Sequence, residues 1–248
     1  DQPIHIQYLN YLDRLSKGDL GKTIRGGQPV LEVIFQRLPN TILLATSAMM
    51  IAILLGVPLG FLAAYNKGTI SDTFIMILAI SGISMPHFWL GLILLFIFAV
   101  DLGWLPVSGS GLLNLVLPAL TLGISNAAIF ARLTRTSMIE ILQQDFVITA
   151  LAKGLPKKYV LRKHVLRAGL IPLVTMMGMQ FAFMMGGAIV VENIFSWNGV
   201  GRMAVEAIFQ RDYPIIQGFI LTFSVIVVFV TISLDVIYAF IDPRIRRS

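Results

Sequence analysis

The sequence predicts an all-α membrane protein that crosses the bilayer several times. Of its 248 residues, 56% are hydrophobic and only 13% are charged, and the mean hydropathy is +0.82. Typical soluble domains are about 25% charged, so a chain this apolar could not cover its surface with polar groups in water. The composition therefore argues against an ordinary soluble enzyme and against a basic nucleic-acid-binding domain.

Five windows that lack Asp, Glu, Lys and Arg are each long enough to cross a membrane. A spanning helix needs about 20 apolar residues, and none of the windows alternates polar and apolar residues as a membrane β-barrel strand would. The third window opens with the turn-rich stretch Leu105–Gly111, so its helix is expected to start near Leu113. The predicted spans are 39–65, 72–100, 113–136, 168–192 and 213–241.

The residue types that support metal or thiol chemistry are scarce. The chain has no cysteine, and its three histidines, His5, His87 and His164, are far apart in the sequence. The absence of cysteine excludes disulfides, thiol nucleophiles and thiolate metal sites. No His-Glu-x-x-His motif is present either. The sequence therefore predicts no catalytic residue and no metal ligand.

The basic residues indicate the orientation in the membrane. The loop 66–72, the segment 132–167 and the tail 242–248 share one side and carry twelve of the 19 lysines and arginines, for a net charge of +8. The loops of the opposite side have a net charge of −1. Since cytoplasmic loops carry an excess of Lys and Arg, the +8 side is predicted to be cytoplasmic.

This orientation predicts three regions. Residues 1–37 form an extracytoplasmic segment, residues 38–241 a transmembrane domain, and residues 242–248 a cytoplasmic tail. The transmembrane domain includes a cytoplasmic loop, 138–167, and an extracytoplasmic loop, 192–212. An extracytoplasmic N-terminus without a signal peptide leads us to expect a further helix before residue 1, which would give six spans in the full-length protein.

The residue pattern of the cytoplasmic loop 138–167 indicates folded structure rather than a solvated basic loop. Helix-forming residues run up to Lys153, Gly154 ends the helix, and Pro156 can open another. Two short helices joined by a glycine turn are therefore expected. Apolar residues such as Phe146 and Leu151 favour docking of a cytoplasmic partner over mere solvation of a charged loop.

The same loop carries a family resemblance. Ala150-Leu-Ala-Lys-Gly154-Leu, followed by Lys163-His-Val-Leu-Arg167-Ala-Gly-Leu-Ile-Pro172, resembles the cytoplasmic loop of ABC importer permeases, in the branch that imports dipeptides, oligopeptides, glutathione and nickel. The loop departs from the general pattern at Ile148, where that loop usually has glutamate. Further matching stretches are Arg37-Leu-Pro39-Asn-Thr41, Ser84-Met-Pro86-His-Phe-Trp89, Gly103-Trp104-Leu105-Pro106, Val191-Glu192-Asn-Ile-Phe195-Ser-Trp197, Arg211-Asp212-Tyr213-Pro214 and Asp242-Pro243-Arg244.

The resemblance implies a permease subunit with the type I ABC importer fold in the cytoplasmic (inner) membrane of a prokaryote. It implies four partners besides membrane lipid: a second homologous permease, two cytoplasmic ATPase subunits and an extracytoplasmic substrate-binding protein. Because the chain lacks the Gly-x-x-x-x-Gly-Lys-Ser/Thr phosphate loop, we expect it to bind no cofactor and to catalyse no reaction. ATP and Mg are then expected on the ATPase subunits, and no nucleic acid is expected as a partner.

The resemblance also implies where the chain contacts an ATPase subunit. A short helix near Gly154 would lie in a groove of that subunit, where small residues permit a close approach and lysines could pair with acidic groups or with anionic lipid. The predicted ATPase-coupling residues are Asp145, Ala150, Ala152, Lys153, Gly154, Leu155, Lys157 and Tyr159.

A second set of residues is predicted to line the substrate pathway. Polar side chains inside apolar spans are costly against lipid and usually face protein or water. Glu192 adjoins a span, where it could meet a cationic substrate or pair with Arg202 or Arg211. The predicted pathway-lining residues are Ser84, Met85, His87, Ser125, Asn126, Gln180, Met184 and Glu192.

Two other functional classes are compatible with a polytopic membrane protein. A self-sufficient secondary transporter or channel would show an inverted repeat and intramembrane charge networks, and neither is evident. An intramembrane protease would need a nucleophile or metal motif, and none is recognisable. The sequence does not decide whether the substrate is a peptide, glutathione or nickel.

Overall fold

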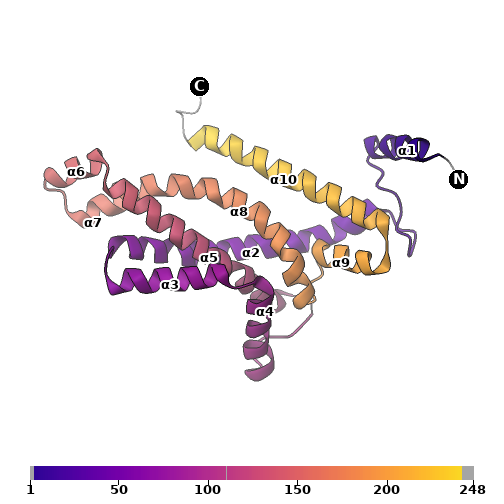
Figure 1. Cartoon of the computed structure of the whole chain (residues 1–248), viewed down its shortest axis with the longest axis horizontal. Coiled ribbons are helices and arrows are strands. Elements are labelled where there is room, and N and C mark those ends of the chain that lie inside the picture. Colours follow the sequence, from indigo (N-terminus) through magenta and orange to yellow (C-terminus); the bar gives the residue numbers. More distant parts are fainter. Residues whose placement is uncertain (1–2, 110, 242–248) are drawn as a thin grey trace.

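The computed structural model describes residues 3–109 and 111–241, which form an elongated bundle of helices (Figure 1). These residues contain one isolated β-bridge, between Lys22 and Pro29, and no strand, so the predicted all-α class is confirmed. The predicted tail 242–248 lies outside the described residues. The helices are α1 (Ile4–Ser16), α2 (Val30–Tyr65), α3 (Ile70–Ser84), α4 (His87–Leu95), η1 (Phe96–Asp101), α5 (Leu112–Leu142), α6 (Asp145–Ala152), α7 (Lys157–Val160), η2 (Leu161–Val165), α8 (Leu166–Ile194), α9 (Val200–Gln210) and α10 (Tyr213–Ile241).

Four long helices match four of the five predicted spans. In the described part of the chain, α2, α5, α8 and α10 are long and apolar enough to cross a membrane. The first predicted span starts at residue 39, just after the last charged residue of α2, Arg37. The helix itself already begins at Val30, because it continues beyond the apolar stretch through Glu32 and Arg37.

The second predicted span, 72–100, is not one straight helix. α3 ends at Ser84, α4 begins at His87, and the two helices meet at an angle of 101°. Pro86 lacks an N–H group and disfavours helical geometry at the residue before it, and Met85 is accordingly extended, with φ −79° and ψ 123°. The predicted span is therefore a bent pair of helices, which counts as a fifth span if the two helices cross the membrane together. Figure 1 shows α4 leaving the bundle almost at a right angle.

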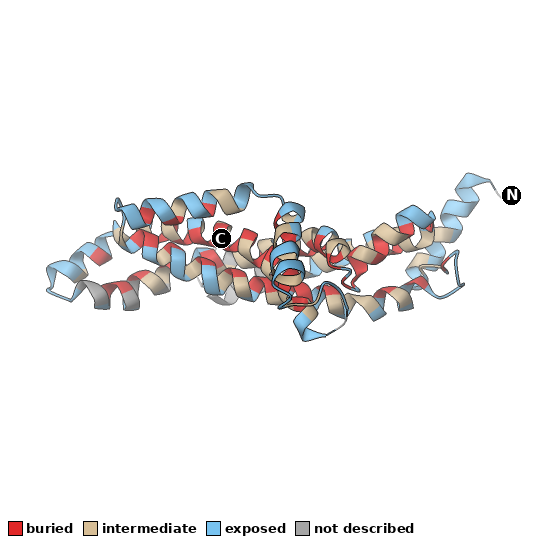
Figure 2. Ribbon diagram, turned by 90° about the horizontal axis from the view of Figure 1, so that it is seen from below, coloured by how far each residue is buried: buried red, intermediate tan, exposed pale blue. Residues whose placement is uncertain are grey.

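The centre of the bundle is the contact between α2 and α5. A Cβ atom on Gly56 would lie 2.5 Å from the carbonyl oxygen of Ala127 and 2.7 Å from Cβ of Phe130. Gly60 meets the Ala131 carbonyl in the same way, one turn further on. In a membrane such small residues let helix backbones approach closely. Figure 2 accordingly shows buried residues along the facing sides of the long helices and exposed ones on their outer sides.

An ion pair ties the start of α3 to α5. Arg135 donates from Nε to one Asp72 carboxylate oxygen at 2.5 Å and from Nη2 to the other at 2.8 Å. The Asp72 carboxylate also accepts the backbone N–H of Gly68 at 3.0 Å and is buried. A two-pronged Arg–carboxylate contact is stronger and more directional than a single hydrogen bond. It fixes the turn between α2 and α3 against α5.

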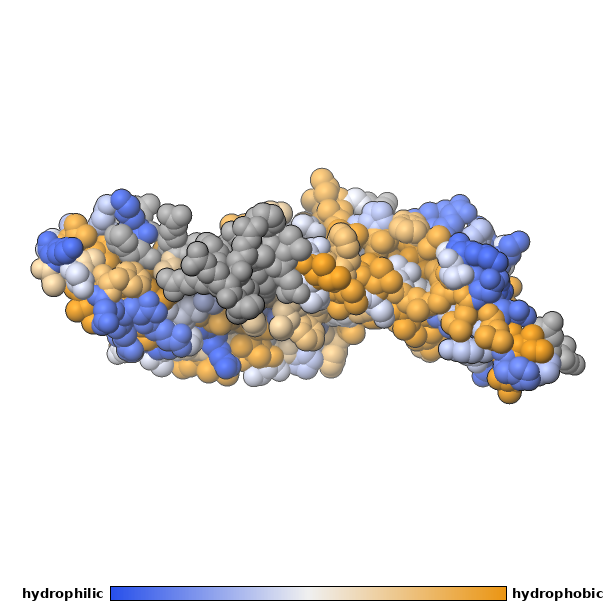
Figure 3. All heavy atoms as spheres, turned by 90° about the horizontal axis from the view of Figure 1, so that it is seen from above, coloured by the Kyte–Doolittle hydropathy of each residue, from blue (hydrophilic) through white to orange (hydrophobic). Residues whose placement is uncertain are grey.

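The two ends of the molecule differ from its middle. α6 and α7 lie at one end of the long axis, and α1 and α9 lie at the other (Figure 1). On the face seen in Figure 3, hydrophilic residues gather toward both ends and hydrophobic residues lie between them. This distribution suits a bilayer that crosses the middle of the molecule.

The glycine contact between α2 and α5 predicts a large effect from one methyl group. Gly56→Ala should lower the free energy of unfolding by about 1–3 kcal/mol, because the added Cβ overlaps the α5 backbone. Gly186→Ala is the matched control, since the nearest atom to its added Cβ is 3.8 Å away. Thermal unfolding of both variants in detergent measures the difference. Equal stability of the two would contradict the close packing described here.

Candidate functional site

The break between α3 and α4 opens a polar pocket of about 300 Å³. Six of the eight predicted pathway residues line it: two precede Pro86, one follows it, two come from α5 and one from α8. Three further residues, Ile83, Pro86 and Ile129, complete the lining. The predicted residues in the pocket are Ser84, Met85, His87, Ser125, Asn126 and Gln180.

Hydrogen bonds hold the polar side chains of this pocket in place. The amide nitrogen of Gln180 donates to the Asn126 side-chain oxygen, and Asn126 donates to the backbone oxygen of Leu122 at 2.8 Å. Ser84 donates to the backbone oxygen of Ile80 at 2.9 Å. Nδ1 of His87 is buried without a hydrogen-bond partner. The pocket thus offers neutral donors and acceptors and no charged side chain.

The depth of the pocket can be estimated from helix geometry. At about 1.5 Å per residue, Gln180 lies about 18 Å along α8 from residue 168, and Asn126 lies about 15 Å along α5 from residue 136; these residues are the predicted cytoplasmic ends of the two spans. With a hydrocarbon thickness of about 30 Å, the pocket lies near the middle of the membrane.

The two remaining predicted pathway residues lie elsewhere. Met184 is 2% exposed and packs in the main apolar core. Glu192 is 0% exposed, and its carboxylate accepts hydrogen bonds from the Thr41 hydroxyl and the backbone N–H of Arg202. The Arg202 side chain does not pair with it, since that guanidinium binds Glu206. We therefore exclude Met184 and Glu192 from the pocket.

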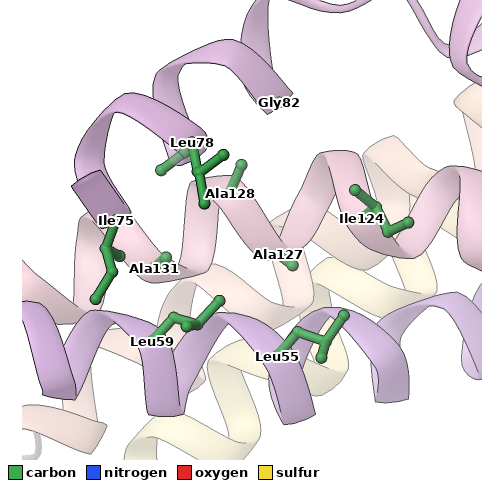
Figure 4. Close-up of a pocket in the computed structure, with 10 residues that line it drawn as sticks. Leu55, Leu59, Ile75, Leu78, Gly82, Ile124, Ala127, Ala128 and Ala131 are labelled. Atoms are coloured by element: carbon green, nitrogen blue, oxygen red, sulfur yellow. The ribbon is translucent and has the colours of Figure 1, made fainter. Parts of the chain in front are cut away.

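A second hollow, of about 270 Å³, lies between α2, α3 and α5 and has different chemistry. Figure 4 shows Leu55 and Leu59 of α2, Leu78 of α3 and Ala127 and Ala128 of α5 around it. All ten lining residues are apolar or glycine. This hollow offers no polar side chain to a substrate, whereas the pocket at the α3–α4 break does.

The loop between α5 and α8 forms the helical hairpin that the sequence predicts. α6 ends at Ala152, Gly154 has φ +81°, and α7 begins at Lys157. The positive φ explains the glycine, because L side chains rarely adopt it. Val147 and Val160 are buried beneath the hairpin.

The outer surface of this hairpin is unusually apolar. The predicted coupling residues that the structure describes are exposed, except Ala150, which is half-buried, and the side chain of Lys157 lies outside the described residues. Among these coupling residues, Leu155 and Tyr159 are exposed apolar side chains, and Phe146, Ile148 and Leu151 are exposed between them. Ile148, the position at which the sequence departs from the general loop pattern, is 55% exposed, so it belongs to the outer surface of the hairpin.

Similar folds occur among solved ABC transporters. The inward-facing MetNI methionine ABC transporter aligns with 85% of this chain and 96% of its own chain, at a TM-score of 0.74 and 16% identity. An amino acid ABC transporter crystallised with histidines aligns with 84% of this chain and 94% of its own, at a TM-score of 0.68 and 14% identity. At these identities the likeness shows the fold.

The family is shown by the sequence itself. Residues 56–247 match the family described as binding-protein-dependent transport system inner membrane component. The chain belongs to this family and is a permease subunit of an ABC importer, as the resemblance implied.

Individual relatives share much more sequence identity with this chain than the solved structures do. The glutathione transport system permease protein GsiC of Salmonella typhimurium is 44% identical over 247 residues, which cover 99% of this chain and 81% of the relative. The protein of the same name from Escherichia coli K12 is 42% identical over the same lengths.

The pocket geometry predicts which positions water-soluble reagents reach. Ser84→Cys and Gln180→Cys should react with a membrane-impermeant thiol reagent, because both positions line the open pocket. Ala48→Cys should stay unmodified, since Ala48 is 0% exposed within the core. The native chain has no cysteine to complicate labelling. Equal labelling at all three positions would contradict this assignment.

Proposed function

We propose that this permease passes glutathione, or a closely similar short peptide, from an extracytoplasmic binding protein across the inner membrane. The observation that carries the proposal is the identity of 44%, along nearly the whole chain, to a permease named for glutathione transport. We also propose a complex with a second homologous permease, two ATPase subunits that bind ATP and Mg, and the binding protein.

The pocket at the α3–α4 break supports a peptide substrate. Peptides carry amide N–H groups and carbonyl oxygens, which the Gln180 and Asn126 amides and the Ser84 hydroxyl can bind as neutral partners. The charged ends of a peptide would remain hydrated, which requires a wet route between this chain and the second permease. A pocket without charge favours passage over retention, since a buried ion pair would hold the substrate.

The substrate assignment is tested by uptake. Membrane vesicles that contain the assembled transporter and its binding protein should take up labelled glutathione when ATP is supplied inside. Unlabelled glutathione should compete, whereas nickel should not. Labelling of Gln180→Cys should slow several-fold while glutathione is being transported, and labelling of a surface control, Lys17→Cys, should not change. Uptake of nickel without glutathione would establish the alternative substrate.

The hairpin at α6 and α7 supports coupling to an ATPase subunit. Its exposed apolar side chains at the predicted cytoplasmic end would lose contact with water in a protein groove, and each buried apolar Å² contributes about 25 cal/mol. The buried Val147 and Val160 attach the hairpin to α5 and to the end of α2. Force applied to the hairpin would therefore reach the helices that line the pocket.

Gly154 provides the test of coupling. Gly154→Trp should abolish co-purification of the ATPase subunits, because a bulky residue at φ +81° distorts the turn and obstructs the docking surface. Gly154→Asn is the matched control, since asparagine tolerates this backbone conformation. It should keep assembly and transport. Normal assembly and transport by Gly154→Trp would disprove the coupling role.

A further inference from the structure

Glu192 has a buried carboxylate that does not line the proposed transport pathway. It lies near the end of α8, about 39 Å along the helix from Leu166, and thus at the outer membrane surface. Thr41 of α2 donates its hydroxyl to this carboxylate at 2.5 Å. The backbone N–H of Arg202 donates to the other carboxylate oxygen at 2.9 Å.

The same residues complete the start of α9. The first N–H groups of a helix have no partner within the helix, and a negative charge there is favoured by the helix dipole. Here the N–H of Val200 donates to the Thr41 hydroxyl oxygen at 2.9 Å, and the N–H of Arg202 donates to Glu192. α9 therefore begins on side chains of α2 and α8. We call this set the brace: Thr41, Glu192 and the N–H groups of Val200 and Arg202.

Two glycines allow the brace to close. A Cβ atom on Gly199 would overlap the Glu192 carboxylate. A Cβ on Gly201 would lie 2.6 Å from Cα of Ile189 and 2.9 Å from a Glu192 oxygen. Any other residue at either position would push α9 away from the carboxylate.

Further contacts run beside the brace along the same stretch of α2. The indole N–H of Trp197 donates to the backbone oxygen of Asn40 at 3.0 Å, and the Asn40 amide donates to the backbone oxygen of Asn198 at 2.7 Å. Arg37 pairs with Glu206 of α9 at 3.4 Å. Three polar residues of α2, Arg37, Asn40 and Thr41, thus bind the segment from Trp197 to Glu206.

From this geometry we propose that α2, the end of α8 and α9 move as one rigid body throughout the transport cycle, with Thr41 and Glu192 as positioning residues. Every hydrogen-bond donor of the brace has an acceptor, and the Glu192 carboxylate is wholly buried. Opening the brace would therefore leave these donors and the carboxylate without partners at the bilayer surface. The proposal rests on the proposed transport function. It means that the outer mouth opens between the two permeases rather than by α9 leaving α2.

A cysteine pair tests whether the brace stays closed. Asn40→Cys with Asn198→Cys places thiols where the Asn40 side chain already reaches residue 198. A short bifunctional thiol reagent should crosslink the pair with equal yield in nucleotide-free, ATP-bound and vanadate-trapped transporter. The single-cysteine variants control for crosslinks between molecules. A yield that falls several-fold in any state, or no crosslink in any state, would overturn the proposal.

The crosslink also separates this proposal from the proposed function. The crosslinking yield is measured without any substrate, and nucleotide trapping is measured in a separate assay. If the native transporter takes up no glutathione or traps no nucleotide, the proposed function fails while the crosslink still reports on the brace. With transport established, the crosslinked pair should retain uptake, and a block that reductant relieves would overturn the proposal.

Thr41 supplies a second, independent test. Thr41→Val keeps the shape but removes the hydroxyl that both donates to Glu192 and accepts from Val200, so uptake should fall about tenfold as α9 shifts. Thr41→Ser retains the hydroxyl and should restore uptake. Co-purification of the ATPase subunits should be unchanged in both. Normal uptake by Thr41→Val, or equal loss in Thr41→Ser, would refute the positioning role.

Discussion

The close contact between α2 and α5 is the constraint on which the rest of the bundle depends. Lipid tails are as apolar as leucine, so helices in a membrane gain little by merely hiding apolar side chains. Gly56 and Gly60 let α2 meet the α5 backbone directly. With these two helices fixed, α3 attaches through Asp72 and Arg135, and α8 packs on their other side. The polar pocket exists because α3, α5 and α8 are held at fixed positions around it.

Function divides along the length of the molecule. One end presents an apolar helical hairpin, the middle holds a small neutral pocket, and the far end is tied together by hydrogen bonds. Each part uses a different physical device: exposed apolar surface, a proline that interrupts a helix, and a buried carboxylate at a helix start. The long helices connect the three parts, so the hairpin and the pocket are joined by packed helices rather than by a loop.

Much of this arrangement could be predicted from sequence because membrane helices have a strong one-dimensional signal. The uncharged windows located the spans, and Gly154 located the hairpin turn. Ser125, Asn126 and Gln180 were found because polar groups in apolar spans need partners. The right-angled break at Pro86 was missed, because proline in a membrane span predicts anything from a slight kink to a full break, and neighbouring helices decide which.

Glu192 shows where local reasoning reaches its limit. Its place beside a span was compatible with a pathway, but its real partners, Thr41 and the N–H of Arg202, come from a distant helix and from the backbone. A hydrogen bond from a backbone N–H cannot be predicted from the side chain of the residue that donates it. The glycines at 199 and 201 were the available signal, because glycine at a helix start permits a close approach to another group.

The glycines around Glu192 also limit how this loop can be altered. A side chain added at Gly199 meets the carboxylate itself, so it could be accommodated only with a shorter residue at 192. A shorter acid would in turn leave the Thr41 hydroxyl and the Arg202 N–H of α9 without their acceptor. The positions 41, 192, 199 and 201 are therefore coupled by direct contact, and an engineered permease with a redesigned outer loop would have to exchange all four together.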